Sequence, residues 1–166
     1  MKLLWVLVMI TCFLGGMVAD SAIHLTRAEP STESPADQTV LMEKPSPGNW
    51  VPETAIKVGN DHVVIDLTGR DVQWSTFTDT NSMDPVLDAG SNGIEVKPNN
   101  ADEIDIGDIV AYKSEYSEGI IIHRVVEKSY DRDGVYFTLK GDNNPRADPG
   151  KVRFEQIQRV LVAIIY

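Results

Sequence analysis

The stretch Gly119-Ile120-Ile121-Ile122-His123-Arg124-Val125-Val126-Glu127-Lys128 decides the fold class of this chain. It is a short piece, rich in β-branched residues and bounded by turn residues, which is typical of a strand. A second run, Val160-Leu161-Val162-Ala163-Ile164-Ile165, is continuously apolar and predicts a buried strand. Between the two lies Val135 to Leu139, and the pair Asp133-Gly134 before it favours a hairpin because both residues tolerate a positive φ. The C-terminal part of the chain is therefore expected to form β-structure.

The same pattern extends towards the N-terminus. Val63 to Leu67, Val72 to Thr78 and Ile104 to Tyr112 predict further strands, the second by its alternation of apolar and polar side chains. The segment Asp88 to Asp105 is long and acidic, and we expect a loop there. Because no segment of this region shows strong helical periodicity, the sequence predicts a mainly β domain.

The composition restricts the classes of function. A chain of 166 residues has room for one domain of ordinary size plus a tail or anchor. The formal net charge of −10 argues against a nucleic-acid partner. The single cysteine, Cys12, excludes an intrachain disulfide framework. No metal-type spacing of cysteine and histidine occurs, and the acidic run Asp102 to Asp108 lacks the spacing of a calcium loop. We therefore expect neither a metal nor a cofactor.

The N-terminal part divides into an apolar stretch and a polar one. Leu3 to Ala19 is at the short end for a membrane-spanning helix and slightly long for the core of a signal peptide. We expect residues 1–22 to form a retained membrane anchor, with a cleaved signal peptide as the alternative. Residues 23–55, rich in Pro, Ser, Thr and Glu, predict a linker to a β-rich domain at residues 56–166. Both interpretations place that domain across a membrane from the cytoplasm.

Ser82 is a candidate nucleophile in the run Thr80-Asn81-Ser82-Met83-Asp84-Pro85-Val86-Leu87. A serine hydroxyl is a poor nucleophile near neutral pH unless a base removes its proton during attack. Ser82 follows a predicted strand and precedes Pro85, so it is expected in a stiff turn with its hydroxyl exposed. Considered alone, it is an ordinary serine of a surface turn, and residues further along the chain are needed to favour catalysis.

His123 is the candidate base, and two aspartates are candidates to orient it. A histidine within an apolar strand costs desolvation free energy unless its ring nitrogens are hydrogen-bonded. His123 would accept the Ser82 proton and pass it to the leaving amine; the alternative is a histidine that only completes the core. Asp142 and Asp148 each lie in a predicted turn, and the spacing does not choose between them.

Together these residues resemble the type I signal peptidase family of serine endopeptidases, from about Trp74 to the C-terminus. Four motifs follow one another in the order of that family: Ser82-Met83-Asp84-Pro85, Gly107-Asp108-Ile109-Val110-Ala111-Tyr112, His123-Arg124-Val125-Val126 and Gly141-Asp142-Asn143-Asn144. His123 stands where the bacterial subclass carries lysine. In this respect the chain resembles the archaeal and endoplasmic-reticulum subclass, in which Ser, His and Asp replace the Ser-Lys pair. Asn81 stands where glycine usually precedes the serine.

The resemblance implies an antiparallel β-sheet domain held by an N-terminal transmembrane helix in the cell membrane, single-pass, with the catalytic domain on the extracytoplasmic side. The implied activity is removal of signal peptides from secretory precursor proteins through an acyl-enzyme on Ser82. Membrane lipid is the other implied partner. His123 would act as base, with Asp142 or Asp148 orienting it.

The resemblance also implies how the substrate is held. The oxyanion hole would combine the Ser82 N–H with the Thr80 hydroxyl. The substrate would bind as an added β-strand along parts of residues 73–78 and 119–122. The substrate-binding residues expected on this basis are Met83, Pro85, Trp74 and Ile121.

Two other functions fit parts of the pattern. A catalytically inactive, membrane-tethered β-domain that acts as a binding or accessory subunit would keep the fold without the chemistry. A self-cleaving regulator of the repressor type uses a Ser-Lys pair and is soluble, so His123 and the apolar N-terminal stretch argue against it. The sequence leaves open the substrates, the accessory subunits and the oligomeric state.

Overall fold

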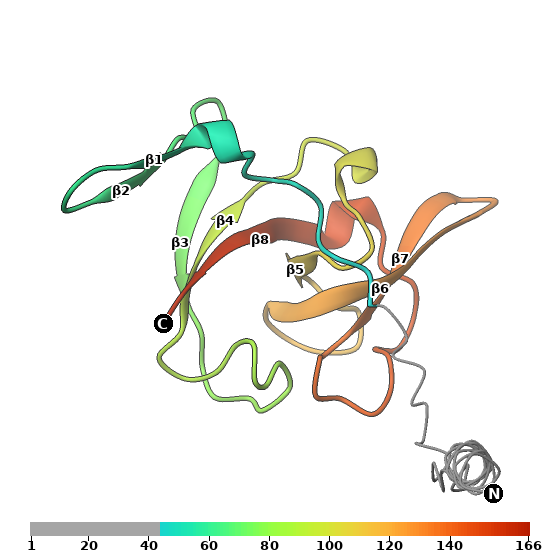
Figure 1. Cartoon of the computed structure of the whole chain (residues 1–166). Helices are drawn as coiled ribbons and strands as arrows, with labels where there is room; N and C mark the ends of the chain where they lie inside the picture. The colour runs from blue at the N-terminus through green and yellow to red at the C-terminus, as the bar shows by residue number, and fades with distance from the viewer. Residues whose placement is uncertain (1–43) are drawn as a thin grey trace, which may run out of the picture. The chain divides into compact units, whose positions relative to one another are not determined.

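The computed structural model describes residues 44–166, which form antiparallel β-sheets joined by short 3-10 helices. The elements in chain order are η1 (Glu53–Ala55), β1 (Ile56–Val58), β2 (Val63–Ile65), β3 (Val72–Thr76), β4 (Asn92–Val96), η2 (Ala101–Glu103), β5 (Ile109–Tyr112), β6 (Ile121–Asp131), β7 (Gly134–Lys140), η3 (Phe154–Gln156) and β8 (Ile157–Ile165). The strands β1 and β2 pair as a hairpin, and the other strands form a six-stranded sheet in the order β3-β4-β8-β5-β6-β7 (Figure 1). The prediction of a mainly β domain is confirmed.

The predicted membrane anchor at residues 1–22, and the linker as far as residue 43, lie outside the described residues. Within residues 44–166, no helix is long and apolar enough to cross a membrane.

The start of the described chain is fixed to the sheet by one buried carboxylate. Asp108, which is fully buried, accepts hydrogen bonds from the backbone N–H of Gly48 at 2.8 Å and from the indole N–H of Trp50 at 3.0 Å. It also accepts the backbone N–H of Asp105 at 2.9 Å. The three donors satisfy the buried carboxylate, which would otherwise be costly, and the two from Gly48 and Trp50 tie that segment to the strand that begins at Ile109.

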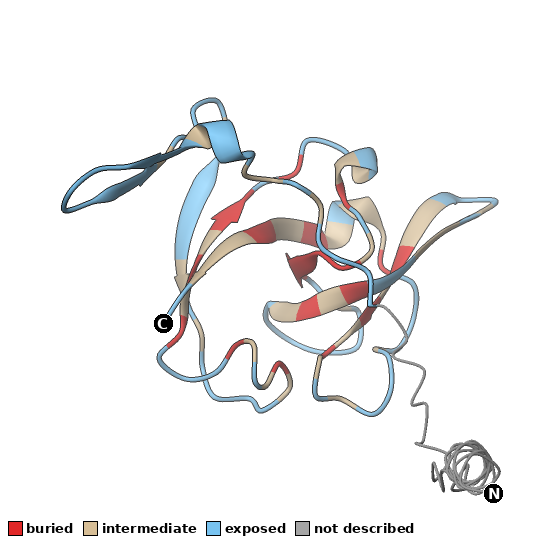
Figure 2. Cartoon of the chain, viewed as in Figure 1, coloured by how far each residue is buried: buried red, intermediate tan, exposed pale blue. Residues whose placement is uncertain are grey.

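Apolar side chains cover both faces of the six-stranded sheet at its centre. Adjacent residues of a strand point to opposite faces. Accordingly, Val110 and Tyr112 of β5 belong to one buried cluster with Val160 of β8, whereas Ile109 and Leu161 belong to a second cluster. Figure 2 shows the buried residues concentrated in these central strands and the hairpin β1–β2 exposed. The second cluster reaches the turn that carries Ser82.

The expectation of a loop from Asp88 to Asp105 is wrong at its centre, where Asn92–Val96 forms β4 between β3 and β8. Asn92 and Gly93 have low β-propensity, which concealed the strand. A Cβ at Gly93 would meet the ends of the Leu161 and Phe77 side chains, so these side chains would have to shift to admit a larger residue. Conversely, the strand predicted from Ile104 begins only at Ile109.

Candidate active site

Ser82 lies in the turn between β3 and β4, half-buried. The residue before it, Asn81, has a φ of 57°, in the left-handed region that asparagine tolerates better than most residues with a side chain. Asparagine therefore suits this position of the turn. The residue after it, Met83, is 2% exposed and packs in the second apolar cluster with Leu87. Burial of such a side chain contributes about 1.5–3 kcal/mol, which anchors the turn.

The loop that follows β7 holds this turn in place from the other side. The backbone N–H of Asn143 donates to the carbonyl oxygen of Ser82 at 3.0 Å, and its side-chain amide donates to the carbonyl oxygen of Asn81 at 2.8 Å. A Cβ at Gly141 would lie 2.5 Å from the Ser82 carbonyl oxygen, so only glycine permits this approach. The Gly-Asp-Asn motif therefore positions the candidate nucleophile through the backbone.

The same loop also reaches the candidate base. His123 on β6 is 6% exposed, and its Nδ1 lies 2.6 Å from Oδ2 of Asp148. The hydroxyl of Tyr112, on the neighbouring strand β5, donates to that oxygen at 2.9 Å. Asp148 itself is fixed by its backbone N–H, which donates to the carbonyl oxygen of Leu139 at 2.8 Å. Of the two aspartates that the sequence left open, Asp148 is the one that contacts the imidazole.

Tyr112 was not among the site residues predicted from the sequence. Burial, followed by the hydrogen bond to Asp148, raises the pKa of Tyr112 well above its ordinary value of 10.0. The phenol therefore remains a hydrogen-bond donor throughout the working pH range. Its position at the end of the Gly107–Tyr112 motif was the available signal.

Asp142 has a different partner. Its carboxylate binds the guanidinium of Arg124 in a bidentate pair, with Nε to Oδ1 at 2.8 Å and Nη2 to Oδ2 at 2.6 Å. A third donor of Arg124 reaches the carbonyl oxygen of Gly107 at 2.7 Å. Bidentate pairing fixes both distance and orientation. Asp142 thus attaches the loop to β6 beside the base without contacting the base.

The second ring nitrogen of His123, Nε2, makes no hydrogen bond with any residue from 44 to 166. In that part of the chain one side-chain oxygen or nitrogen is both fully buried and unpaired, and it is Oδ1 of Asp84. Nε2 is thus not among the fully buried unpaired atoms of residues 44–166. The hydroxyl of Ser82 is 3.1 Å from Oγ1 of Thr80, and no hydrogen bond joins Ser82 to His123 in the described structure.

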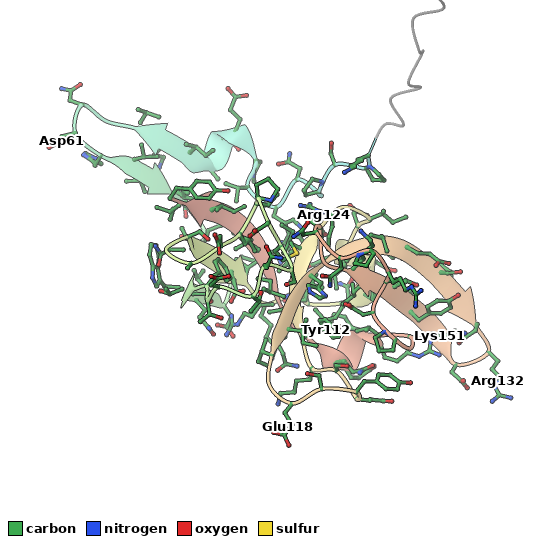
Figure 3. The ribbon with its side chains drawn as sticks, turned by 90° about the horizontal axis from the view of Figure 1, so that it is seen from below. Asp61, Tyr112, Glu118, Arg124, Arg132 and Lys151 are labelled. Carbon is green, nitrogen blue, oxygen red and sulfur yellow. The ribbon has the colours of Figure 1, made fainter. Side chains whose placement is uncertain are left out.

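A cavity of about 550 Å³ lies against Ser82 and Thr80, and its lining extends to Ile122 but does not include His123. It is lined by Thr80, Ser82 and Met83 from the turn, by parts of β3 and β4, and by residues 120–122. In the sheet, β3 and β6 are separated by β4, β8 and β5. Residues of both strands nevertheless line the same cavity, so the sheet curls around it. Figure 3 shows Tyr112 inside the domain, whereas Glu118 projects from the loop before β6 at the edge of the domain.

The substrate-binding residues predicted from the sequence fall into two groups. Met83 and Ile121 line the cavity, and Trp74 and Pro85 do not. Trp74 is 57% exposed, and its neighbours Gln73 and Ser75 line the cavity instead. Adjacent side chains of a strand point to opposite faces, so Trp74 points away from the face that carries Gln73 and Ser75.

Two strand edges border the cavity without a partner strand. β3 is the edge strand of the sheet. β7 pairs with β6 only from Arg124 onwards, so β6 has no strand partner on that side at residues 121–123. Free N–H and C=O groups on such edges can pair with an added strand. For residues 44–166 there is no cluster of three or more His, Cys, Asp or Glu side chains arranged to hold a metal ion.

Comparison with known proteins gives one partial relationship. Over 43 residues the chain is 51% identical to the uncharacterized protein MJ0260 of Methanocaldococcus jannaschii, a stretch that covers 25% of this chain and 21% of that protein. The match thus spans about a fifth of the length of the relative. No protein-family profile matches the chain, and no solved structure matches it.

Proposed function

We propose that this chain is a serine endopeptidase of the signal peptidase type that removes signal peptides from secretory precursors through an acyl-enzyme on Ser82. The observation that carries the proposal is the pair between His123 and Asp148, at 2.6 Å. It is made by the loop that also bonds the Ser82 turn through Asn143. A histidine with one nitrogen held by a carboxylate and the other free is the arrangement that a general base requires.

The reaction would begin with attack of the Ser82 hydroxyl oxygen on the scissile carbonyl carbon. Nε2 of His123 takes the hydroxyl proton and then gives it to the leaving amine, which leaves an ester on Ser82. Water, deprotonated by the same nitrogen, cleaves the ester and regenerates the serine. The negative charge of Asp148 stabilises the imidazolium formed in both steps, and Tyr112 holds that carboxylate in place.

For this chemistry the Ser82 hydroxyl must exchange its contact with Thr80 for one with His123. Catalytic hydrogen bonds are often long or absent in a free enzyme and form when substrate binds. The backbone N–H of Ser82 makes no hydrogen bond within residues 44–166, and the Thr80 hydroxyl lies 3.1 Å from the nucleophile. These two groups are the proposed oxyanion hole, and loss of one such donor typically costs about 10²–10³ in kcat.

The proposed substrate is an extended peptide added to the sheet. An extended segment in the cavity would pair with the free edges of β3 and of residues 121–123, with its alternate side chains directed into the space beside Met83 and Ile121. The proposed location, outside the cytoplasm on an anchor at residues 1–22, rests on the apolar stretch of the sequence.

The test is cleavage of a peptide that spans a signal-peptide cleavage site. The unmodified chain should cut it after a small residue, while Ser82→Ala and His123→Ala should abolish cutting with an unchanged circular dichroism spectrum. Thr138→Ala is a matched control, because it removes a hydroxyl of β7 that bonds Glu127 and lies outside the cavity. Cleavage by folded Ser82→Ala at the unmodified rate would contradict the proposal.

A second function is favoured by the contact between Ser82 and Thr80 at 3.1 Å. A domain whose serine is held in this way without substrate-induced exchange would bind extended peptides and not cut them. In that case the unmodified chain and Ser82→Ala would bind the peptide with equal affinity, and neither would release a product.

A further inference from the structure

One acidic side chain in the cavity has no role in the proposed chemistry. Glu95, on β4, is 4% exposed and lines the cavity. The Ser75 hydroxyl donates to its Oε2 at 2.5 Å. None of the ion pairs formed within residues 44–166 includes Glu95. The residues that line the cavity include a second glutamate, Glu118, and neither lysine nor arginine.

The other carboxylate oxygen of Glu95, Oε1, has no hydrogen-bond partner within residues 44–166. It is not among the fully buried unpaired atoms, of which Asp84 Oδ1 is the single instance in that part of the chain. A carboxylate held by one hydroxyl and otherwise unpaired has a substantial desolvation cost. A glutamine or an apolar residue at this position of β4 would carry a lower desolvation free energy.

We propose that Glu95 selects substrates that direct a lysine or arginine side chain into this cavity; this rests on the proposed peptidase function of the same groove. Oε1 would accept a charge-assisted hydrogen bond from the ammonium or guanidinium group, which supplies the positive partner that residues 44–166 do not provide. Phe77, Leu87 and Ile122 line the same cavity and offer apolar surface to the methylene stem of such a side chain.

The position of Glu95 suits a peptide strand added at β3. In the sheet register Glu95 lies opposite Gln73 of the edge strand, and Ser75 is the next residue of β3 that faces the cavity. A peptide paired along the outer edge of β3 would therefore direct every second side chain into the cavity, towards Glu95. The volume of about 550 Å³ accommodates a side chain of the length of lysine.

The experiment measures peptide binding to the Ser82→Ala variant, so that no peptide is consumed. Fluorescently labelled alanine-rich peptides carry one lysine placed at each position in turn, and each is matched by a peptide with uncharged norleucine at the same place. Fluorescence polarisation should give about tenfold tighter binding of the lysine peptide at one position, equivalent to about 1.4 kcal/mol. When Glu95→Gln is added to Ser82→Ala, the ratio of the two dissociation constants at that position should fall below about twofold.

Glu155→Gln is the matched control, since it removes the same charge from an exposed residue of η3 outside the cavity. It should keep the tenfold preference. Equal binding of every lysine and norleucine pair would overturn the proposal without any need for the Glu95 variant to fold. Retention of the preference by folded Glu95→Gln would overturn it as well.

A separate assay distinguishes this failure from failure of the peptidase function. Cleavage of the norleucine peptides by the chain with Ser82 intact reports on the chemistry alone. Cleavage without any preference for lysine refutes the role of Glu95 and leaves the peptidase function standing. Binding with a Glu95-dependent preference but no cleavage supports the role of Glu95 and refutes the peptidase function.

Discussion

The substitution Asp148→Asn separates the two aspartates that flank the candidate base. Asp148 accepts hydrogen bonds from the imidazole Nδ1 at 2.6 Å and from the Tyr112 hydroxyl at 2.9 Å, both at the same oxygen. Asparagine keeps the size of the side chain and one oxygen, so the tyrosine contact can survive. What is lost is the negative charge that stabilises the imidazolium and fixes the proton on Nδ1.

The size of the effect follows from that geometry. A hydrogen bond to a charged group contributes about 1.5–3 kcal/mol. Since about 1.36 kcal/mol corresponds to a tenfold change in rate, loss of the charge alone lowers kcat/KM by about 10- to 150-fold. If the amide group also faces Nδ1, the wrong tautomer is favoured, and the loss approaches about 10⁴-fold. We expect kcat/KM to fall by at least about 10-fold and at most about 10⁴-fold for Asp148→Asn.

The assay is kcat/KM for a fluorogenic signal-peptide substrate, measured beside Asp142→Asn as the comparison. The Asp142 carboxylate pairs with Arg124, and both side chains are about a fifth exposed, at 20% and 23%. Its replacement should cost about 1–3 kcal/mol of stability and reduce kcat/KM by less than about tenfold while the domain is folded. If Asp148→Asn keeps most of the activity and folded Asp142→Asn loses it, the assignment of the orienting carboxylate is refuted.

Three further predictions concern the groups around this pair. Tyr112→Phe removes one hydrogen-bond donor to Asp148. It should reduce kcat/KM for peptide cleavage by about 3- to 20-fold and lower the stability measured by urea unfolding by about 1 kcal/mol. An unchanged kcat/KM would contradict the positioning role of Tyr112. In Gly141→Ala the added Cβ meets the Ser82 carbonyl oxygen. The Ser82 turn should therefore be displaced, with lower peptidase activity and a stability loss of about 1–3 kcal/mol. A fully active variant of unchanged stability would show that the close approach is not required. The hydrogen bond from Lys151, ahead of that from Arg153, lowers the pKa of Asp131 from 3.8 to about 2. Asp131 therefore stabilises the fold at neutral pH and loses this contribution as the pH falls from 3.8 through about 2. The stability difference between the unmodified chain and Asp131→Asn, measured by urea unfolding, should shrink over the same pH range. A stability difference that is independent of pH would contradict the assignment.

The sequence predicted the strands whose patterns are local. The run around His123, the hairpin at Asp133-Gly134 and the apolar run from Val160 all fall on β6, β7 and β8. β4 escaped prediction because two of its residues, Asn92 and Gly93, have low β-propensity and are held by neighbouring strands rather than by their own preference.

For the site, the sequence supplied the candidates, and the structure supplied their pairing. Asp142 and Asp148 have equal claims in the sequence, since the choice depends on how the loop after β7 folds back on β6. For Tyr112 the sequence offered only its position at the end of the Gly107–Tyr112 motif, and for Glu95 it offered no signal. Each is one residue of a strand, and its significance comes from a partner supplied by another segment, Asp148 for Tyr112 and Ser75 for Glu95.

The central claim is that Ser82 forms a covalent acyl intermediate. Intact-protein mass spectrometry after rapid mixing with an activated peptide ester, followed by acid quench, tests it most directly. The account predicts a mass increase equal to the acyl group, located on the peptide that contains Ser82 and absent from Ser82→Ala. Turnover of the ester without an adduct, or an adduct of equal yield in Ser82→Ala, would contradict it.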